Sequence, residues 1–159
     1  MNNTMRELLA GHRFCSRMKP EYIGTIASCS ITKSYKPNEM LGREGELSDY
    51  FFLIMDGRVA IESSQPGLPP VVLQTLHGGE VVGWSWLFPP YEWVFDARAL
   101  TDVETIALDA QCLKEKCEED NALGFDLMKR FSQVMTTRLK AARLQLLDLY
   151  GRQSSNLTA

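Results

Sequence analysis

Side chains that commonly carry catalysis or hold a metal are sparse in this sequence. It contains two histidines, His12 and His77, with no second histidine at a metal-ligand spacing from either. A metal-dependent β-barrel enzyme of the cupin type needs several such ligands, so the sequence argues against one. There is also no Gly-x-Ser-x-Gly motif for a nucleophilic serine. We therefore expect no catalytic residues, no metal site and no enzyme activity.

The cysteines form no Cys-x-x-Cys pair. They are Cys15, Cys29, Cys112 and Cys117. The last two lie five residues apart on a predicted helix, about 140° from a common face, and make a poor metal pair. The N-terminus lacks the basic and apolar blocks of a signal peptide, and the longest apolar run, Tyr50–Met55, is too short to span a bilayer. We expect four free thiols, a cytoplasmic protein and no membrane contact.

One stretch of twelve residues, 84–95, is unusually aromatic. Its rings are Trp84, Trp86, Phe88, Tyr91, Trp93 and Phe95. Two interpretations stay open. The rings could line a pocket for a small flat ligand or a nucleobase, held by stacking and cation–π contacts. They could equally fill the interior, because protein cores tolerate few voids.

These residues must be positioned by one compact domain. The chain has 159 residues, of which 45% are hydrophobic and 23% charged, which suffices for a single core and excludes a disordered protein. Its net charge of −3 lacks the basic excess expected of a nucleic-acid-binding domain.

The hydrophobic period changes twice along the chain. Residues 4–28 show helical spacing, and from about residue 30 to residue 108 short β-rich runs are separated by turn residues. The predicted strands are Ile31–Tyr35, Tyr50–Met55, Arg58–Glu62, Val71–Leu76, Val81–Trp84, Val94–Leu100 and Glu104–Leu108. Asp56-Gly57 predicts a two-residue hairpin between the second and third of these. Seven or eight strands at this spacing predict a barrel or sandwich.

Helix returns after Asp109, first over 110–119 and then from Ala122 to about Tyr150. The long helix carries an apolar seam with alternating spacings of three and four residues, close to a heptad repeat. Its members are Met128, Phe131, Met135, Leu139, Ala142, Leu146 and Leu149. Such a seam could pack on the chain's own barrel, but its length and period favour pairing with a second copy, and from Phe131 onward we expect it to be a homodimer interface.

Two glycine-containing segments carry a family resemblance. They are Leu41–Glu46, followed by Asp49, Ile54, Gly57, Val59 and Ile61, and Gly79–Gly83. Together with helices, strands and a long final helix, they resemble the cyclic nucleotide-binding domain, in particular the sensor half of the cyclic AMP receptor protein and fumarate-nitrate regulator (Crp/Fnr) superfamily. The segment Gly-Trp-Ser-Trp-Leu-Phe-Pro-Pro is similar to short, free-standing bacterial members without a DNA-binding domain.

The resemblance implies an α+β fold: an eight-stranded antiparallel, jelly-roll-like β-roll with N-terminal helices and a long C-terminal dimerisation helix. We expect one domain over residues 1–150, with a helical N-terminus (1–29), the β-roll (30–108), C-terminal helices (110–150) and a tail (151–159). Haem-binding sensors of the superfamily make haem ligation by His77 conceivable, although an exposed turn is the simpler interpretation of that residue.

The resemblance also locates a phosphate-binding cassette. Members of the family hold the ribose with a Glu after the cassette glycine and the phosphate with an Arg six residues before a strand alanine. Here the glycine is Gly83, the Glu position is Trp84, and six residues before Ala99 stands Trp93. Both polar anchors are missing, so the cassette is degenerate. Arg98 is the nearest cation, and strand alternation places it on the face opposite Trp93 unless the strand bulges.

The candidate ligand-binding residues are therefore Gly83, Trp84, Ser85, Trp86, Trp93, Arg98 and Ala99. We expect a non-catalytic regulatory domain that couples occupancy of its roll, by a cyclic nucleotide or another small flat effector, to a C-terminal helix dimer. The alternative is a ligand-free dimeric adaptor, and either could act on a separate effector protein. Only nine residues follow Tyr150, too few for a helix-turn-helix, so no sequence-specific DNA binding is expected.

Overall fold

The fold comes from a computed structural model, which describes residues 2–157 and the side chains of residues 4–153. The elements in chain order are α1 (Asn2–Gly11), η1 (Arg13–Cys15), α2 (Pro20–Ala27), β1 (Ser30–Tyr35), β2 (Met40–Gly42), β3 (Tyr50–Asp56), β4 (Arg58–Ser63), β5 (Val71–His77), β6 (Val81–Val82), η2 (Ser85–Leu87), β7 (Asp96–Ala99), β8 (Val103–Asp109), α3 (Ala110–Glu119) and α4 (Asn121–Leu157). The chain divides into two compact units, residues 1–123 and residues 124–159.

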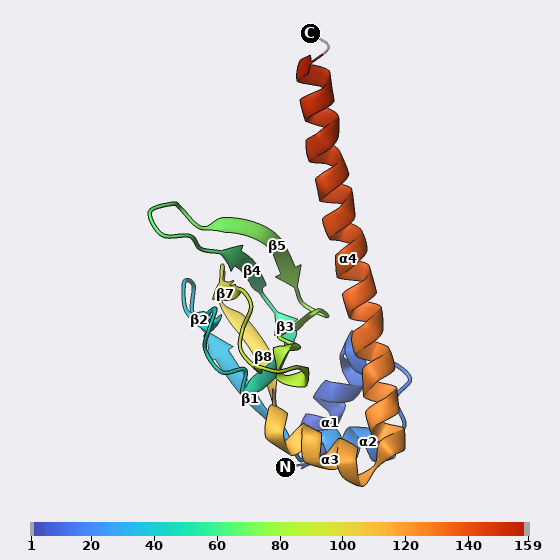
Figure 1. Cartoon of the computed structure of the whole chain (residues 1–159). Helices are drawn as coiled ribbons and strands as arrows, with labels where there is room; N and C mark the ends of the chain where they lie inside the picture. The colour runs from blue at the N-terminus through green and yellow to red at the C-terminus, as the bar shows by residue number, and fades with distance from the viewer. Residues whose placement is uncertain (1, 158–159) are drawn as a thin grey trace. The chain divides into compact units, whose positions relative to one another are not determined.

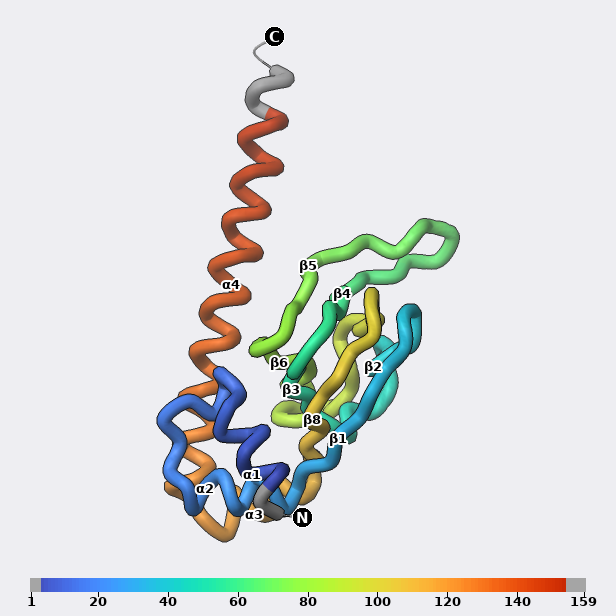
Figure 2. The backbone as a smooth tube through the Cα atoms, turned by 180° about the vertical axis from the view of Figure 1, so that it is seen from behind, coloured from blue at the N-terminus to red at the C-terminus, as the bar shows by residue number. Residues whose placement is uncertain are grey.

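The strands of the first unit form two antiparallel sheets of four (Figure 1). One has the order β1-β8-β3-β6 and the other β2-β7-β4-β5. The view from behind shows β4 and β5 continuing into an extended hairpin (Figure 2). This is the expected α+β roll. The three-residue strand β2 was not predicted, because so short a segment carries no period.

The core lies between the two sheets. One sheet contributes Phe52 and Ile54 from β3, and the other contributes Ala97 and Ala99 from β7. Trp93, which precedes β7, belongs to the same buried cluster. The opposite side of β3 is also buried, since Phe51 and Leu53 are not exposed. Burial on both sides of β3 explains the uninterrupted apolar run that the sequence shows there.

The predicted hairpin at Asp56-Gly57 is wrong. Gly57 has the positive φ of 98° that the dipeptide suggests, but β3 pairs with β6 and β8 whereas β4 pairs with β5 and β7. The turn therefore carries the chain from one sheet into the other. Turn chemistry determines local dihedral angles and leaves the partner of each strand undetermined.

The expectation of free thiols is wrong for two of the four cysteines. Cys29 and Cys112 form a disulfide, with their Cα atoms 5.6 Å apart. Cys117 is a free thiol, and Cys15 is buried. The pair escaped prediction because its members are separated by 83 residues and meet only through the pairing of β1 with β8.

The second unit consists of most of α4, which is longer than expected. The helix continues through Gly151 to Leu157 instead of ending near Tyr150. A glycine inside a helix costs only about 1 kcal/mol relative to alanine, which is too little to end it. Ion pairs four residues apart, Arg130 with Asp126 and Arg152 with Asp148, support the helix along its length.

Candidate functional site

The cassette segment, residues 83–99, begins with a sharp bend at Gly83, which directly follows β6. Its φ of 87° lies in the left-handed region that favours glycine. The next residue, Trp84, is half-buried and precedes the single turn η2, which contains Ser85 and Trp86. Trp86 is buried and packs on Phe51, with ring centroids 6.4 Å apart. The turn expected from the resemblance is therefore present, and it is anchored by an aromatic contact.

Trp93 points into the roll. Only 7% of the residue is exposed, and its ring lies 6.3 Å from that of Phe52. A Cβ atom added to Gly83 would lie 2.9 Å from the indole, and one added to Gly42 would overlap it. Two glycines thus make room for this one ring. The backbone of Trp93 is held as well, because its N–H donates to Glu46 O (2.8 Å) and its carbonyl accepts from the N–H of Gly45.

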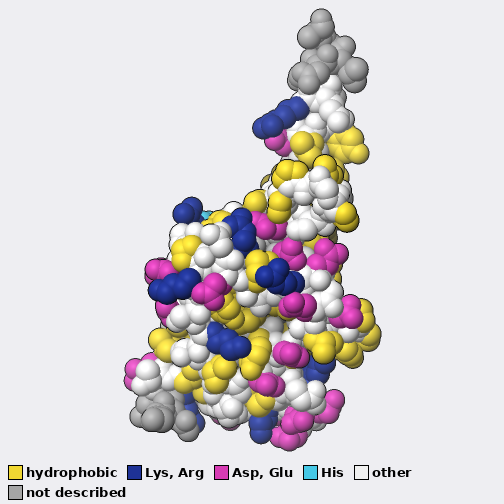
Figure 3. Space-filling model, turned by 90° about the vertical axis from the view of Figure 1, so that its left-hand side faces the viewer, with side chains coloured by type: hydrophobic (Ala, Val, Ile, Leu, Met, Phe, Trp, Pro, Cys, Tyr) yellow, Lys and Arg dark blue, Asp and Glu magenta, His cyan; other side chains and the backbone are white. Residues whose placement is uncertain are grey.

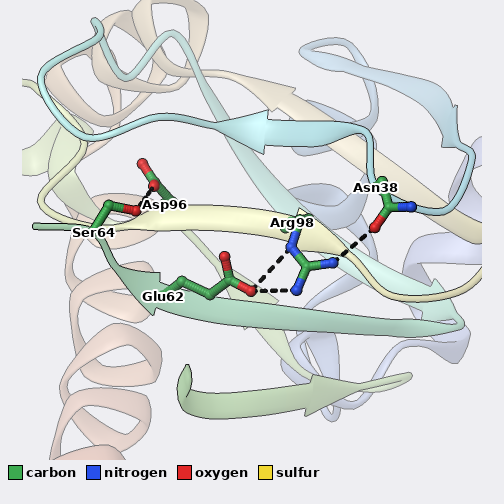
Figure 4. A network of polar contacts seen from close by, with 5 residues as sticks. All are labelled: Asn38, Glu62, Ser64, Asp96 and Arg98. Carbon is green, nitrogen blue, oxygen red and sulfur yellow. Dashed lines mark hydrogen bonds and ion pairs between the residues drawn. The ribbon is translucent and has the colours of Figure 1, made fainter. Parts of the chain in front are cut away.

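Arg98 lies on the other face of β7, as strand alternation predicts. Ala97 and Ala99 on either side of it are fully buried in the cluster that contains Trp93. The guanidinium points away from that cluster, donating from Nε (3.0 Å) and Nη2 (2.5 Å) to Glu62 Oε1, and from Nη1 (2.8 Å) to Asn38 Oδ1 (Figure 4). The hydrogen bond to Glu62 raises the pKa of Arg98, so the side chain stays charged.

Glu62 and Asp96 are structural residues that the sequence analysis missed. The Glu62 side chain is 4% exposed and is the carboxylate partner of Arg98. Asp96 accepts from Ser64 Oγ (Figure 4) and also from Glu44 N, and so connects two loops to the start of β7. Strand alternation alone cannot reveal either role, because both depend on which strands pair with β7.

The remaining aromatic side chains of the segment are solvent-accessible. Phe88, Tyr91 and Phe95 are 57%, 39% and 43% exposed. The ammonium group of Lys114, from α3, lies 3.7 Å from the ring centroid of Tyr91. The twelve-residue segment is thus split between two buried tryptophans and an accessible rim.

The predicted seam of α4 is buried only around its second member, since Met128 is 37% exposed. Phe131 is buried and Met135 is half-buried, whereas Leu139, Ala142, Leu146 and Leu149 are exposed. Hydrophobic side chains are visible along this helix in the space-filling view (Figure 3). Beyond Met135 the members of the seam are therefore all accessible.

Neither histidine lies in the cassette. His12 is buried; its Nδ1 accepts from Phe14 N (3.1 Å), so Nε2 carries the proton and donates to Ile54 O (2.9 Å). Burial lowers the pKa of His12. His77 is exposed at the end of β5. Among the described residues, no group of three or more His, Cys, Asp or Glu side chains could hold a metal ion.

Within the part of the chain that the structure describes, no helix is both long and apolar enough to cross a membrane.

Solved structures share this fold. A protein of Geobacter metallireducens GS-15 described as cyclic nucleotide-binding is 27% identical, with a TM-score of 0.76 over 84% of this chain and 97% of that one. The sensor domain of the transcriptional regulator DNR from Pseudomonas aeruginosa is 15% identical, with a TM-score of 0.70 over 87% and 93%. The regulatory domain of Toxoplasma gondii PKA, crystallised with cAMP, is 18% identical, with a TM-score of 0.71 over 86% and 50%.

The sequence was also compared with curated proteins and with models of protein families. No protein with a curated description matches this sequence. The model of the cyclic nucleotide-binding domain matches residues 32–120, which is more than half of the chain and includes the whole cassette segment. No catalytic family is indicated, and the structural neighbours include regulators. The chain belongs to the cyclic nucleotide-binding domain family.

Proposed function

We propose that this chain is a non-catalytic regulatory domain whose roll is filled by its own tryptophan, and which acts as a homodimer through α4 without holding a cyclic nucleotide. The observation that carries the proposal is the burial of Trp93 among Phe52, Gly42 and Gly83. In the family pattern this position holds the arginine that binds the phosphate. An indole there supplies volume in place of charge.

The chemistry of the cassette supports this proposal. A cyclic phosphate needs a cation, and its ribose needs an acceptor for a hydroxyl group. The two family positions hold Trp84 and Trp93, which can do neither. The guanidinium of Arg98 is occupied by Glu62 and Asn38 on the opposite face of β7. Freeing it would leave a buried carboxylate without its partner, which costs about 2 kcal/mol because the pair is partly open to solvent on the arginine side.

The accessible seam of α4 supports self-association. Leu139, Leu146 and Leu149 are 55%, 53% and 57% exposed at heptad-like spacing. Isolated exposed leucines are ordinary, but a periodic stripe on one face is typical of a helix that pairs with another. We propose a second copy of this chain as the occupant, because a two-fold axis would bring each seam against its own equivalent.

A second candidate function is sensing of a small flat effector on the aromatic rim. The exposure of Phe88, Tyr91 and Phe95 beside half-buried Trp84 favours it, since such rings can stack on a ligand. In this case the effector would bind outside the filled core. The two candidates differ in whether a bound ligand is required, and they share the same dimer.

Isothermal titration calorimetry with cyclic AMP and cyclic GMP tests the proposal. Each lost charge-assisted contact removes roughly 1.5 to 3 kcal/mol, so losing the cation and the carboxylate weakens binding by about two to four decades. We expect no binding tighter than high micromolar by the wild type. The variant carrying Trp84→Glu and Trp93→Arg should gain binding, whereas Phe88→Glu, placed in the same segment but exposed, should not. Sub-micromolar binding by the wild type would refute the proposal.

A further inference from the structure

One covalent link in the structure has no part in the cassette. The disulfide between Cys29 and Cys112 joins the residue before β1 to the first turn of α3. We propose that this pair is a reversible thiol–disulfide site, which locks α3 to the roll when oxidised and releases its first turn when reduced. The inference does not depend on the function proposed above.

Two hydrogen bonds of Asp109, one from its backbone and one to its side chain, hold the two cysteines near each other independently of the disulfide. The N–H of Asp109 donates to Cys29 O at 2.8 Å, continuing the β1–β8 ladder by one step beyond Ser30 and Leu108. The side chain of Asp109 caps α3 by accepting from the N–H of Cys112, also at 2.8 Å. Reduction therefore leaves both thiols next to each other on a folded scaffold. Such a pair can close again quickly, because little chain entropy remains to be lost.

The two cysteines differ in exposure, which favours one direction of exchange. Cys29 is 5% exposed, whereas Cys112 is half-buried. An incoming thiolate therefore attacks Cys112 Sγ; the Cys29–Cys112 bond breaks, and Cys29 Sγ leaves as a thiolate that takes up a proton. The hydroxyl of Ser28 lies 4.0 Å from Cys29 Sγ, but its one hydrogen is donated to Thr25 O, so it can only accept a hydrogen bond from the resulting Cys29 thiol.

A soluble dithiol completes the reduction. Its second thiol attacks the mixed disulfide, releases the Cys112 thiolate and becomes a disulfide itself, so that two electrons pass from the dithiol to the protein. Glutathione disulfide reverses the change by accepting two electrons from the pair and becoming two molecules of glutathione. Neither the reduction nor the oxidation uses a protein group other than the two cysteines.

The other cysteines are poor competitors for this exchange. Burial, together with the charges of Asp120 and Glu118, raises the pKa of the Cys117 thiol. A thiol with a raised pKa is mostly protonated and therefore a slow nucleophile. Cys15 is 2% exposed and is not accessible to a soluble reagent. Cys29 and Cys112 thus differ from the other two cysteines because they are bonded to each other and because Cys112 is only half-buried.

Reduction changes what holds the first turn of α3. The oxidised pair ties Cys112 to Cys29 covalently, whereas the reduced pair leaves the Asp109 cap and the packing of buried Leu113. Helix termini depend strongly on such local restraints. We therefore expect the amides of α3 to open more often in the reduced state while the two sheets stay folded.

The test combines alkylation with hydrogen exchange. The purified chain is equilibrated with dithiothreitol or with glutathione disulfide, alkylated with N-ethylmaleimide and mapped by mass spectrometry. We expect a linked Cys29–Cys112 peptide under oxidising conditions, two alkylated peptides under reducing conditions, and amide exchange in α3 that is roughly tenfold faster when the pair is reduced. Oxidation after reduction should restore the linked peptide.

Two variants make the result specific. Cys117→Ser should keep the whole cycle. The double variant Cys29→Ser and Cys112→Ser should show the fast α3 exchange under both conditions. The proposal is overturned by failure of the linked peptide to form in glutathione disulfide, by resistance of the bond to dithiothreitol, by unchanged α3 exchange, or by loss of the far-ultraviolet circular dichroism of the whole chain on reduction.

Discussion

Replacing Trp93 by alanine should destabilise the domain strongly. A tryptophan side chain buries up to about 250 Å², and Trp93 is 7% exposed. At about 25 cal/mol per Å², its burial contributes at most about 6 kcal/mol. Removal of a buried tryptophan typically costs about 3 to 5 kcal/mol, because the neighbours close only part of the cavity. We expect about 4 kcal/mol, since the ring contacts Phe52 and fits between Gly42 and Gly83.

Urea denaturation followed by circular dichroism measures this change. In a thermal scan, a loss of this size lowers Tm by roughly 8 to 16 °C. The matched control is Phe88→Ala in the same segment, where the side chain is 57% exposed and the change should stay within about 0.5 kcal/mol. Added indole should partly restore the stability of Trp93→Ala by binding the cavity. A Trp93→Ala variant as stable as the Phe88→Ala control would show that Trp93 does not fill the core.

Three further predictions concern protonation, an ion pair and assembly. Because burial lowers the pKa of His12 below 6.5, the free energy of unfolding should decrease as pH falls below about 6.5. Urea titrations at several pH values measure this dependence, and the His12→Asn variant should show a weaker one. Arg98→Ala should cost about 2 kcal/mol in the same assay by leaving the Glu62 carboxylate buried, and Glu62→Gln in that background should recover part of the loss. Light scattering should find the wild type dimeric and the Leu139→Glu variant monomeric. The control variant Leu144→Glu, whose change lies on the opposite face of α4, should stay dimeric. A monomeric wild type would exclude the seam as an interface.

The sequence predicts elements better than it predicts their partners. The strands of the roll and the seam of α4 show clear periods, and the inward place of Trp93 follows from its position in the family pattern. The supposed Asp56-Gly57 hairpin is instead a crossing between sheets, because a tight turn forms equally well whether or not its flanking strands pair. The disulfide and the partner of Arg98 depend on long-range pairing, which local patterns do not encode.

The extent of the regular elements also differs from the prediction for identifiable reasons. The predicted strand Val94–Leu100 is shorter, since β7 begins only at Asp96. The predicted strand Val81–Trp84 ends at Val82, because the positive φ of Gly83 breaks the extended backbone. Exposed Val94 and Phe95 carry the residue types of a strand without its hydrogen bonds, and side-chain type alone cannot distinguish the two.

A crystal structure of the wild-type chain grown with millimolar cyclic AMP would test most directly whether the roll is filled by its own side chain. We predict the indole of Trp93 packed against Phe52 beside Gly42 and Gly83, with no nucleotide inside the roll. A nucleotide bound between the sheets, with the Trp93 side chain displaced toward solvent, would contradict the proposal and identify the chain as a cyclic nucleotide receptor.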